Sequence, residues 1–155
     1  MLKLRIYVDT SVIGGCYDEE FSTWSNRFFE EVRQGLKIVI ISDLTYAELD
    51  GAPANVKRVL NSLSAQCIEG VSLTQEAENL AQSYVQEQVV SLQQIADAQH
   101  IAIATIAKAD LLVSWNFKQI VNLKQIHSFN AVNLKLGYPI LEIRSPREVV
   151  GEEEV

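Results

Sequence analysis

The chain has 155 residues, 48% of them apolar, and a formal net charge of −7. This length suits one domain with a sizeable core, so we expect a single domain over 1–150 and an acidic tail over 151–155. The charge argues against a broad basic surface for nucleic acid, and no apolar run approaches the ~18 residues of a membrane span. Two cysteines without metal-type spacing, and no signal peptide, predict a cytoplasmic protein with reduced thiols.

The first predicted element is a strand from Leu4 to Val8, a short apolar run of a composition typical of strands buried on both faces. The run ends abruptly in Asp9, Thr10 and Ser11, which have little packing value there. Ligands bind at the carboxyl ends of strands in open α/β sheets, so Asp9 is the first candidate site residue. The alternative is that Asp9 or Thr10 only caps the next turn.

The rest of the chain alternates between helix-type and strand-type patterns. Apolar residues at three- and four-residue spacings mark helices, and short apolar runs mark buried strands. Capping signals at Ser42, Thr74 and Ser91 begin three of the helices. In chain order we expect a helix over 19–34, a strand over 36–41, helices over 43–49 and 55–63, a short strand near 67–68, helices over 74–89 and 91–107, a strand over 111–113, a helix over 123–136, a strand over 140–143 and a last turn from Ser145.

This alternation predicts right-handed crossovers and an α/β fold with three α/β/α layers. The central sheet should be mostly parallel and contain about five strands. Parallel strands end along one edge of a sheet. Polar residues that follow different strands are therefore expected to come together at that edge.

Four such residues are candidates for one site. Asp9 ends the first strand, Glu48 follows the second, Asp97 lies near the start of the helix before the fourth, and Asn116 ends the fourth. Clustered carboxylates raise one another's pKa, so a protein keeps such a cluster mainly where a cation binds. Oxygen ligands favour Mg²⁺ or Mn²⁺, and an open site of this kind suits phosphodiester hydrolysis.

Each of these residues also has a purely structural interpretation. Glu48 would close a capping box with Thr45, Asp97 would be a favourable charge at a helix N-terminus, and Asn116 would cap the following turn. Taken singly, the structural interpretation is favoured for each residue. All four on one edge of the sheet favour the site.

Other polar and aromatic residues are weaker candidates. His100 lies three residues after Asp97, on roughly the same helix face, but neither it nor His127 has a second histidine at ligand spacing. Both are expected to be structural or surface residues. Trp24 fits a buried helix stripe, whereas Trp115 is equally compatible with the core and with stacking on a base.

The ordered motifs Val8–Ser11, Tyr46–Leu49, Ala96–Ala102 and Ala109–Asn116 resemble those of PIN-domain proteins. That family includes the VapC-type toxin ribonucleases of toxin–antitoxin pairs. The resemblance implies a PIN-like fold, Mg²⁺-dependent RNA cleavage that leaves a 5′-phosphate, an RNA substrate, an antitoxin protein partner and a homodimer. It implies the catalytic residues Asp9, Glu48, Asp97 and Asn116, of which the first three are metal ligands, and the substrate-binding hydroxyls Thr10, Ser11 and Ser114.

The sequence departs from the family pattern at one position. The family's last motif usually ends in Thr or Ser, a variable residue and Asp, whereas this chain has Ser114-Trp115-Asn116. Asn116 offers a carbonyl oxygen without a charge, so a second cation would be held less tightly. The alternative function is a PIN domain that binds RNA or protein without cutting. A third hypothesis, a flavodoxin-like phosphate-binding domain, is disfavoured because no glycine-rich phosphate loop follows the first strand.

Overall fold

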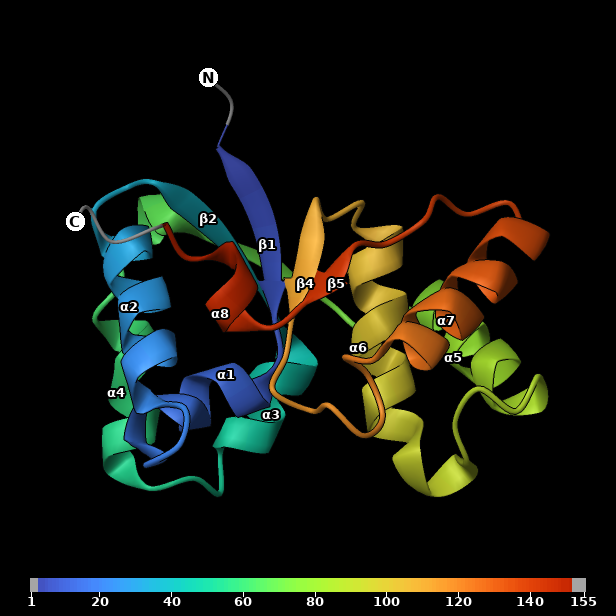
Figure 1. Cartoon of the computed structure of the whole chain (residues 1–155), viewed down its shortest axis with the longest axis horizontal. Coiled ribbons are helices and arrows are strands. Elements are labelled where there is room, and N and C mark those ends of the chain that lie inside the picture. The colour runs from blue at the N-terminus through green and yellow to red at the C-terminus, as the bar shows by residue number, and fades with distance from the viewer. Residues whose placement is uncertain (1–2, 152–155) are drawn as a thin grey trace.

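Five parallel strands form the central sheet of the computed structural model, which describes residues 3–151 (Figure 1). The predicted α/β class and the number of strands are confirmed. The predicted acidic tail falls on residues 152–155 beyond Gly151, which lie outside the described residues. The strands run in the spatial order β3-β2-β1-β4-β5, with bounds β1 Leu4–Val8, β2 Lys37–Ser42, β3 Ile68–Val71, β4 Leu111–Val113 and β5 Ile143–Arg144.

Helices cover both faces of this sheet, which makes the three expected layers (Figure 1). Side chains alternate along each strand, so Ile6 and Val8 enter one core while Tyr7 enters the other. In the described part of the chain, no helix combines the length and apolarity needed to cross a bilayer. The helices are α1 Thr10–Gly14, α2 Ser22–Arg33, α3 Asp43–Leu49, α4 Ala54–Asn61, α5 Gln75–Gln86, α6 Ile95–Ile106, α7 Leu123–Lys135 and α8 Pro146–Val149.

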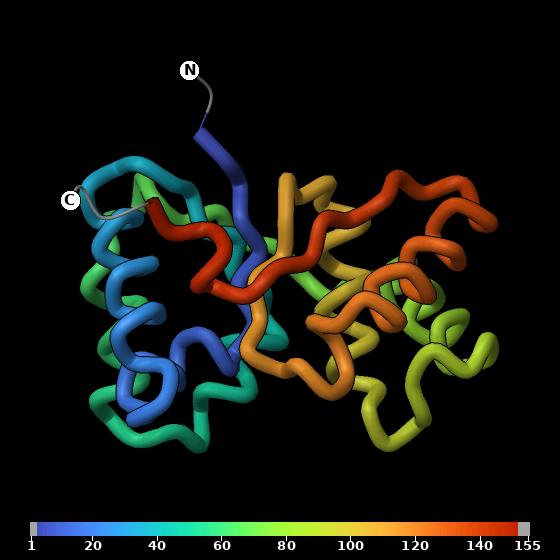
Figure 2. The backbone as a smooth tube through the Cα atoms, in the orientation of Figure 1, coloured from blue at the N-terminus to red at the C-terminus, as the bar shows by residue number. Residues whose placement is uncertain are grey.

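The strand order places the topological switch point of the sheet between β1 and β4. From β1 the chain continues through β2 to β3 on one side, and then returns to add β4 and β5 on the other. Val8 pairs in register with Val113, so these two strands end side by side. Crevices at the carboxyl ends of strands around a switch point are the usual ligand sites of such sheets. After β5 the chain crosses to pack α8 against α2 (Figure 2).

Two predicted elements are displaced in the structure, and one observed helix was not predicted. The helix expected over 19–34 begins only at Ser22, because the Asp18 carbonyl and side chain organise a turn before it. The short helix α1 after β1 was not predicted as a helix. The strand expected over 140–143 is shifted to Ile143–Arg144, since the Asn130 side chain hydrogen-bonds both the amide and the carbonyl of Leu141 and holds it away from the sheet.

Gly14 and Gly15, in the segment after β1, are expected to respond in opposite ways to replacement by alanine. A Cβ at Gly15 would lie 2.6 Å from Ser25 Oγ and 2.7 Å from Trp115 Nε1, whereas a Cβ at Gly14 meets nothing within 4 Å. Both residues have helical backbone angles. We therefore expect Gly15→Ala to lower the free energy of unfolding by about 1–3 kcal/mol through overpacking. Gly14→Ala should raise it by about 0.4–1 kcal/mol by restricting the unfolded chain.

Urea unfolding followed by tryptophan fluorescence measures both changes. Gly14→Ala is the control for any general effect of a methyl group in this segment. Equal effects of the two substitutions would show that the contact of Gly15 with Trp115 is not tight in solution.

Candidate active site

Asp9 lies at the carboxyl end of β1, at the switch point, and its side chain is held there by two serines. Ser11 Oγ donates to Asp9 Oδ1 and Ser114 Oγ donates to Asp9 Oδ2, both at 2.6 Å. Asp9 occupies the N-cap position of α1, but its side chain makes no capping hydrogen bond. The capping alternative for Asp9 is therefore not what the structure shows. The residue is 5% exposed, so its carboxylate is almost fully removed from water.

The same two serines connect the ends of β1 and β4. Ser11 Oγ accepts from the backbone amide of Trp115 at 2.9 Å, and Ser114 Oγ accepts from the amide of Asn116 at 3.0 Å. Each hydroxyl thus donates to Asp9 and accepts from the β4 loop. This arrangement fixes the loop relative to the carboxylate.

Glu48 is brought to this edge by α3, but it is bonded to neighbours other than Asp9. Thr10 Oγ1 donates to Glu48 Oε1 at 2.7 Å, and His100 Nε2 lies 2.6 Å from the same oxygen. The capping-box alternative for Glu48 is not observed. Thr45 lies inside α3, and the N-cap of that helix is Ser42, whose side chain accepts from the Thr45 amide.

His100 is the site residue that the sequence interpretation missed. It is 3% exposed, so of the two expectations, a structural or a surface residue, the surface one does not apply. Its Nδ1 lies 2.6 Å from the Tyr7 hydroxyl, which in turn lies 2.7 Å from Ser42 Oγ. Since a carboxylate only accepts, Nε2 must carry the proton shared with Glu48. The available signal was the spacing of three residues from Asp97, which places both side chains on one face of α6.

Asp97 lies in the first turn of α6, near enough to the side chain of Asn116 for Asn116 to lower its pKa. Asn116 Oδ1 accepts from the amide of Gln119 at 3.0 Å, so Asn116 caps the turn after β4. The capping interpretation of Asn116 and its place beside a carboxylate are thus both observed.

Burial and mutual repulsion disfavour ionisation of the two aspartates. Burial raises the pKa of Asp9, although the charge of protonated His100 and the hydrogen bonds from Ser11 and Ser114 oppose this rise. Burial, followed by the negative charge of Asp9, raises the pKa of Asp97. For Glu48, burial also acts to raise the pKa, but the hydrogen bond and charge of His100 outweigh it and the pKa is lowered. At this edge of the sheet, the pKa values of Asp9 and Asp97 are therefore raised, whereas the pKa of Glu48 is lowered by its partner His100.

This donor set fits Mg²⁺ or Mn²⁺ through Asp9 and Asp97. Mg²⁺ is commonly held by one or two carboxylates and retains several waters. Repulsion between two buried carboxylates is what a bound cation relieves. Within residues 3–151, however, no three His, Cys, Asp or Glu side chains converge closely enough to hold a metal ion. Glu48 as a third ligand stays a prediction.

The electrostatics predict how stability of the metal-free protein depends on pH. The pKa of Asp97 in the folded chain lies above its ordinary value of 3.8, so the folded chain binds this proton more tightly than the unfolded chain. The resulting stabilisation is complete below that value and is lost as the pH rises through the folded-state pKa. Asp97→Asn, which does not ionise, should therefore raise the free energy of unfolding in EDTA near neutral pH, and the gain should vanish near about pH 3.

Urea unfolding across this pH range, with EDTA present throughout, measures the effect. Asp110→Asn is the matched control, because Asp110 lies at the other end of β4, where its Oδ2 accepts from the Arg5 amide at 2.8 Å. That substitution should give no gain near neutral pH. A loss of stability in Asp97→Asn near neutral pH that disappears near about pH 3 would instead identify Asp97 as a helix-stabilising charge.

Comparison with known proteins identifies the fold. No model of a protein family matches the sequence, and no curated protein is similar to it. Among solved structures, Mycobacterium tuberculosis VapC20, a sarcin-ricin loop cleaving toxin, superposes with a TM-score of 0.56 at 14% identity, covering 88% of this chain and 98% of the other. A chain of VapBC2 from Rickettsia felis, solved with a promoter DNA fragment, gives 0.55 at 13% identity, covering 92% and 98%. The chain thus has the fold of VapC-type PIN-domain toxins, as its motifs indicated.

Proposed function

We propose that the chain is a Mg²⁺- or Mn²⁺-dependent ribonuclease that hydrolyses phosphodiester bonds in RNA. The observation that supports this best is the pair of carboxylates at the switch point of a PIN-like fold: Asp9 is buried, Asp97 is half-buried, and the charge of Asp9 raises the pKa of Asp97. Among the similar solved chains, VapC20 is described as a sarcin-ricin loop cleaving toxin, and another chain comes from VapBC2.

In this proposal the four acidic and amide residues have different tasks. Asp9 and Asp97 hold the metal, and Glu48 provides a third carboxylate, oriented by His100 and Thr10. Asn116 lies beside Asp97 and favours its ionised form, which binds metal. A bound Mg²⁺ or Mn²⁺ would activate water and stabilise the charge that develops on the phosphate.

Three hydroxyl groups support these residues. Ser11 and Ser114 fix the Asp9 carboxylate, and Thr10 fixes Glu48. Thr10 and Ser11 are only half-buried, so their hydroxyls can also meet the substrate, whereas Ser114 is fully buried. Direct contact with the RNA is therefore assigned to Thr10 and Ser11, and Ser114 acts through Asp9.

A second candidate function is a PIN domain that binds RNA or a protein but cuts poorly. It is favoured by the state of Asn116, whose oxygen is used by the Gln119 amide and which brings no negative charge. It is also favoured by Glu48, which is bonded to His100 rather than to a shared cation site. The two functions differ in whether RNA is cleaved when metal is supplied.

We further propose that the chain is the toxin of a toxin–antitoxin pair and forms a homodimer. The support is the fold shared with VapC20 and with a chain of VapBC2. An antitoxin would inhibit by placing an Arg or Lys against the carboxylates, since a charge-assisted hydrogen bond there competes with metal.

Cleavage of single-stranded or looped RNA should require Mg²⁺ or Mn²⁺ and should stop in excess EDTA. Asp9→Asn and Asp97→Asn should each reduce the rate to background, because each removes half of the charge that holds the cation. The measurement is the appearance of 5′-phosphate products from a labelled RNA. Intact folding of the variants is checked by urea unfolding. Cleavage that persists in EDTA would exclude this mechanism, and no cleavage with either metal would leave the binding function.

His100 offers a separate test of the arrangement around Glu48. His100→Gln retains an amide donor for Glu48 but breaks the link to Tyr7, whereas His100→Ala removes both. Partners of this kind, which orient metal-binding carboxylates, typically contribute about 10–100-fold to metal affinity or activity. We expect His100→Ala to lose activity in this range and His100→Gln to retain most of it.

The measurements are the rate of RNA cleavage and the Mn²⁺ affinity determined by calorimetry, each alongside urea unfolding. If both His100 variants lose stability and activity equally, His100 only fills the core. If the two variants are equally stable but only His100→Ala loses activity and Mn²⁺ affinity, then His100 acts by orienting Glu48.

A further inference from the structure

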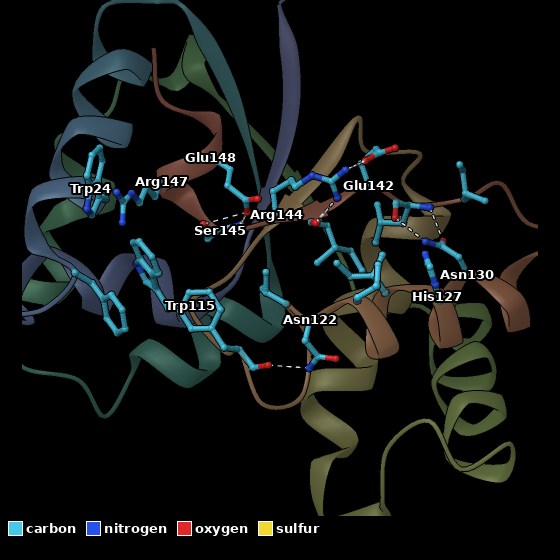
Figure 3. Close-up of a pocket in the computed structure, with 18 of the residues that line it drawn as sticks. Trp24, Trp115, Asn122, His127, Asn130, Glu142, Arg144, Ser145, Arg147 and Glu148 are labelled. Atoms are coloured by element: carbon cyan, nitrogen blue, oxygen red, sulfur yellow. Dashed lines mark hydrogen bonds and ion pairs between the residues drawn. The ribbon is translucent and has the colours of Figure 1, made fainter. Parts of the chain in front are cut away.

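A groove of about 990 Å³ lies over the edge strand β5, outside the carboxylate site. One wall comes from α7, and the other comes from α8 together with the start of α2 (Figure 3). Its lining is mixed, with aromatic rings, two arginines and several polar side chains. None of the proposed catalytic residues lines it. The groove therefore needs an explanation of its own.

Three stacked and tilted rings form one part of the wall. The rings of Phe21 and Trp115 stack with centroids 4.3 Å apart and planes 14° apart. Phe117 lies 6.4 Å from Phe21 and 6.1 Å from Trp115. Trp115 is 7% exposed and its Nε1 donates to Ser25 Oγ at 2.8 Å, whereas Phe117 is 48% exposed. Trp115 thus belongs to the core and supports the neighbouring rings. Phe117 is the ring on which a ligand can stack.

The second part of the wall carries the cations. The Arg147 guanidinium lies 5.0 Å from the Trp24 ring centroid, in a cation–π contact. Arg144 lines the groove beside it and is paired with Glu142 at 2.8 Å. Glu148 is also in the lining, but it accepts from the Ser145 amide at 2.9 Å and so closes the capping box of α8. Glu20 is the third carboxylate of the lining, after Glu142 and Glu148, so the groove is not a broad basic surface. A ligand would interact with it mainly by stacking a planar group on an aromatic ring.

The groove joins the carboxylate edge through consecutive residues. Trp115 lies between Ser114, which donates to Asp9, and Asn116, which lies near Asp97. The amide of Trp115 also donates to Ser11 Oγ. The aromatic wall of the groove is therefore continuous, along the chain, with the residues that contact the two carboxylates.

We propose that this groove binds single-stranded RNA on its way to the carboxylate edge, with a base on Phe117 and a phosphate near Arg147. The proposal rests on the function proposed above and adds the place and manner of substrate binding. Single-stranded RNA is recognised largely by stacking of unpaired bases on aromatic rings and arginine planes, with cations near the backbone. A protein segment would also fit an apolar groove, but continuity with the carboxylates and the exposed ring favour the nucleic acid.

The experiment measures binding of a fluorescein-labelled single-stranded RNA of about 12 nucleotides to the full chain by anisotropy. EDTA is present, so that cleavage cannot occur. Phe117→Ala should raise Kd at least about fivefold, as expected for loss of one stacked base. Arg147→Gln should raise Kd and reduce the slope of log Kd against log salt by about 0.7, as expected for loss of one phosphate contact.

Leu136→Ala is the matched control, because Leu136 is 47% exposed and lies outside the groove. It should leave Kd unchanged. Equal Kd for wild type and Phe117→Ala, or no RNA binding at all, overturns the groove as an RNA site and leaves a protein segment as its occupant. That result is distinct from failure of the proposed function, which shows as a lack of metal-dependent cleavage even when RNA binds through Phe117.

Discussion

The burial of Asp9 at the end of the central strand is the constraint on which the rest of the site depends. An ionised carboxylate out of water is costly unless it is hydrogen-bonded, and two serine hydroxyls supply those bonds. Because one serine follows β1 and the other ends β4, the bonds can form only when these strands are neighbours in register. The topology of the sheet and the chemistry of its edge are thus fixed by the same contacts. Burial still raises the pKa of Asp9, so the two hydrogen bonds offset only part of the cost of removing its carboxylate from water.

Much of the fold could be predicted from local patterns. Strands β1 and β4 were predicted with the observed bounds, because both are short apolar runs buried on two faces. The alternation of strands and helices, with the right-handed crossover rule, was enough for a parallel three-layer fold. The same rule predicted Asp9, Glu48 and Asn116 at one edge, since parallel strands end there, whereas the place of Asp97 depended on how its helix packs. In each case the information was local or came from a general rule of chain connection.

The rest depended on contacts between residues distant in sequence. The spacing of His100 from Asp97 was its only sequence signal, and its role comes from Glu48 on α3 and Tyr7 on β1, which only the folded sheet brings to it. The place of β5 was set by Asn130 on α7, whose amide pairs with Leu141 like a neighbouring strand. Asn116 shows a further limit of prediction from sequence, because its residue type is compatible with both a cap and a site residue. In the structure its oxygen caps the turn after β4, and its side chain also lies near Asp97.

The link from Glu48 through His100 to Tyr7 has a consequence for motion. Tyr7 is fully buried in the central strand, and its hydroxyl also contacts Ser42, the N-cap of the helix that carries Glu48. Release of that helix end would leave polar groups unpaired inside the core, which is costly. The amide proton of Thr45, which donates to Ser42 Oγ, should accordingly exchange with solvent only when this end of the helix is released from the sheet. The side of the site that carries Glu48 is therefore tied through Tyr7 to the central strand of the sheet.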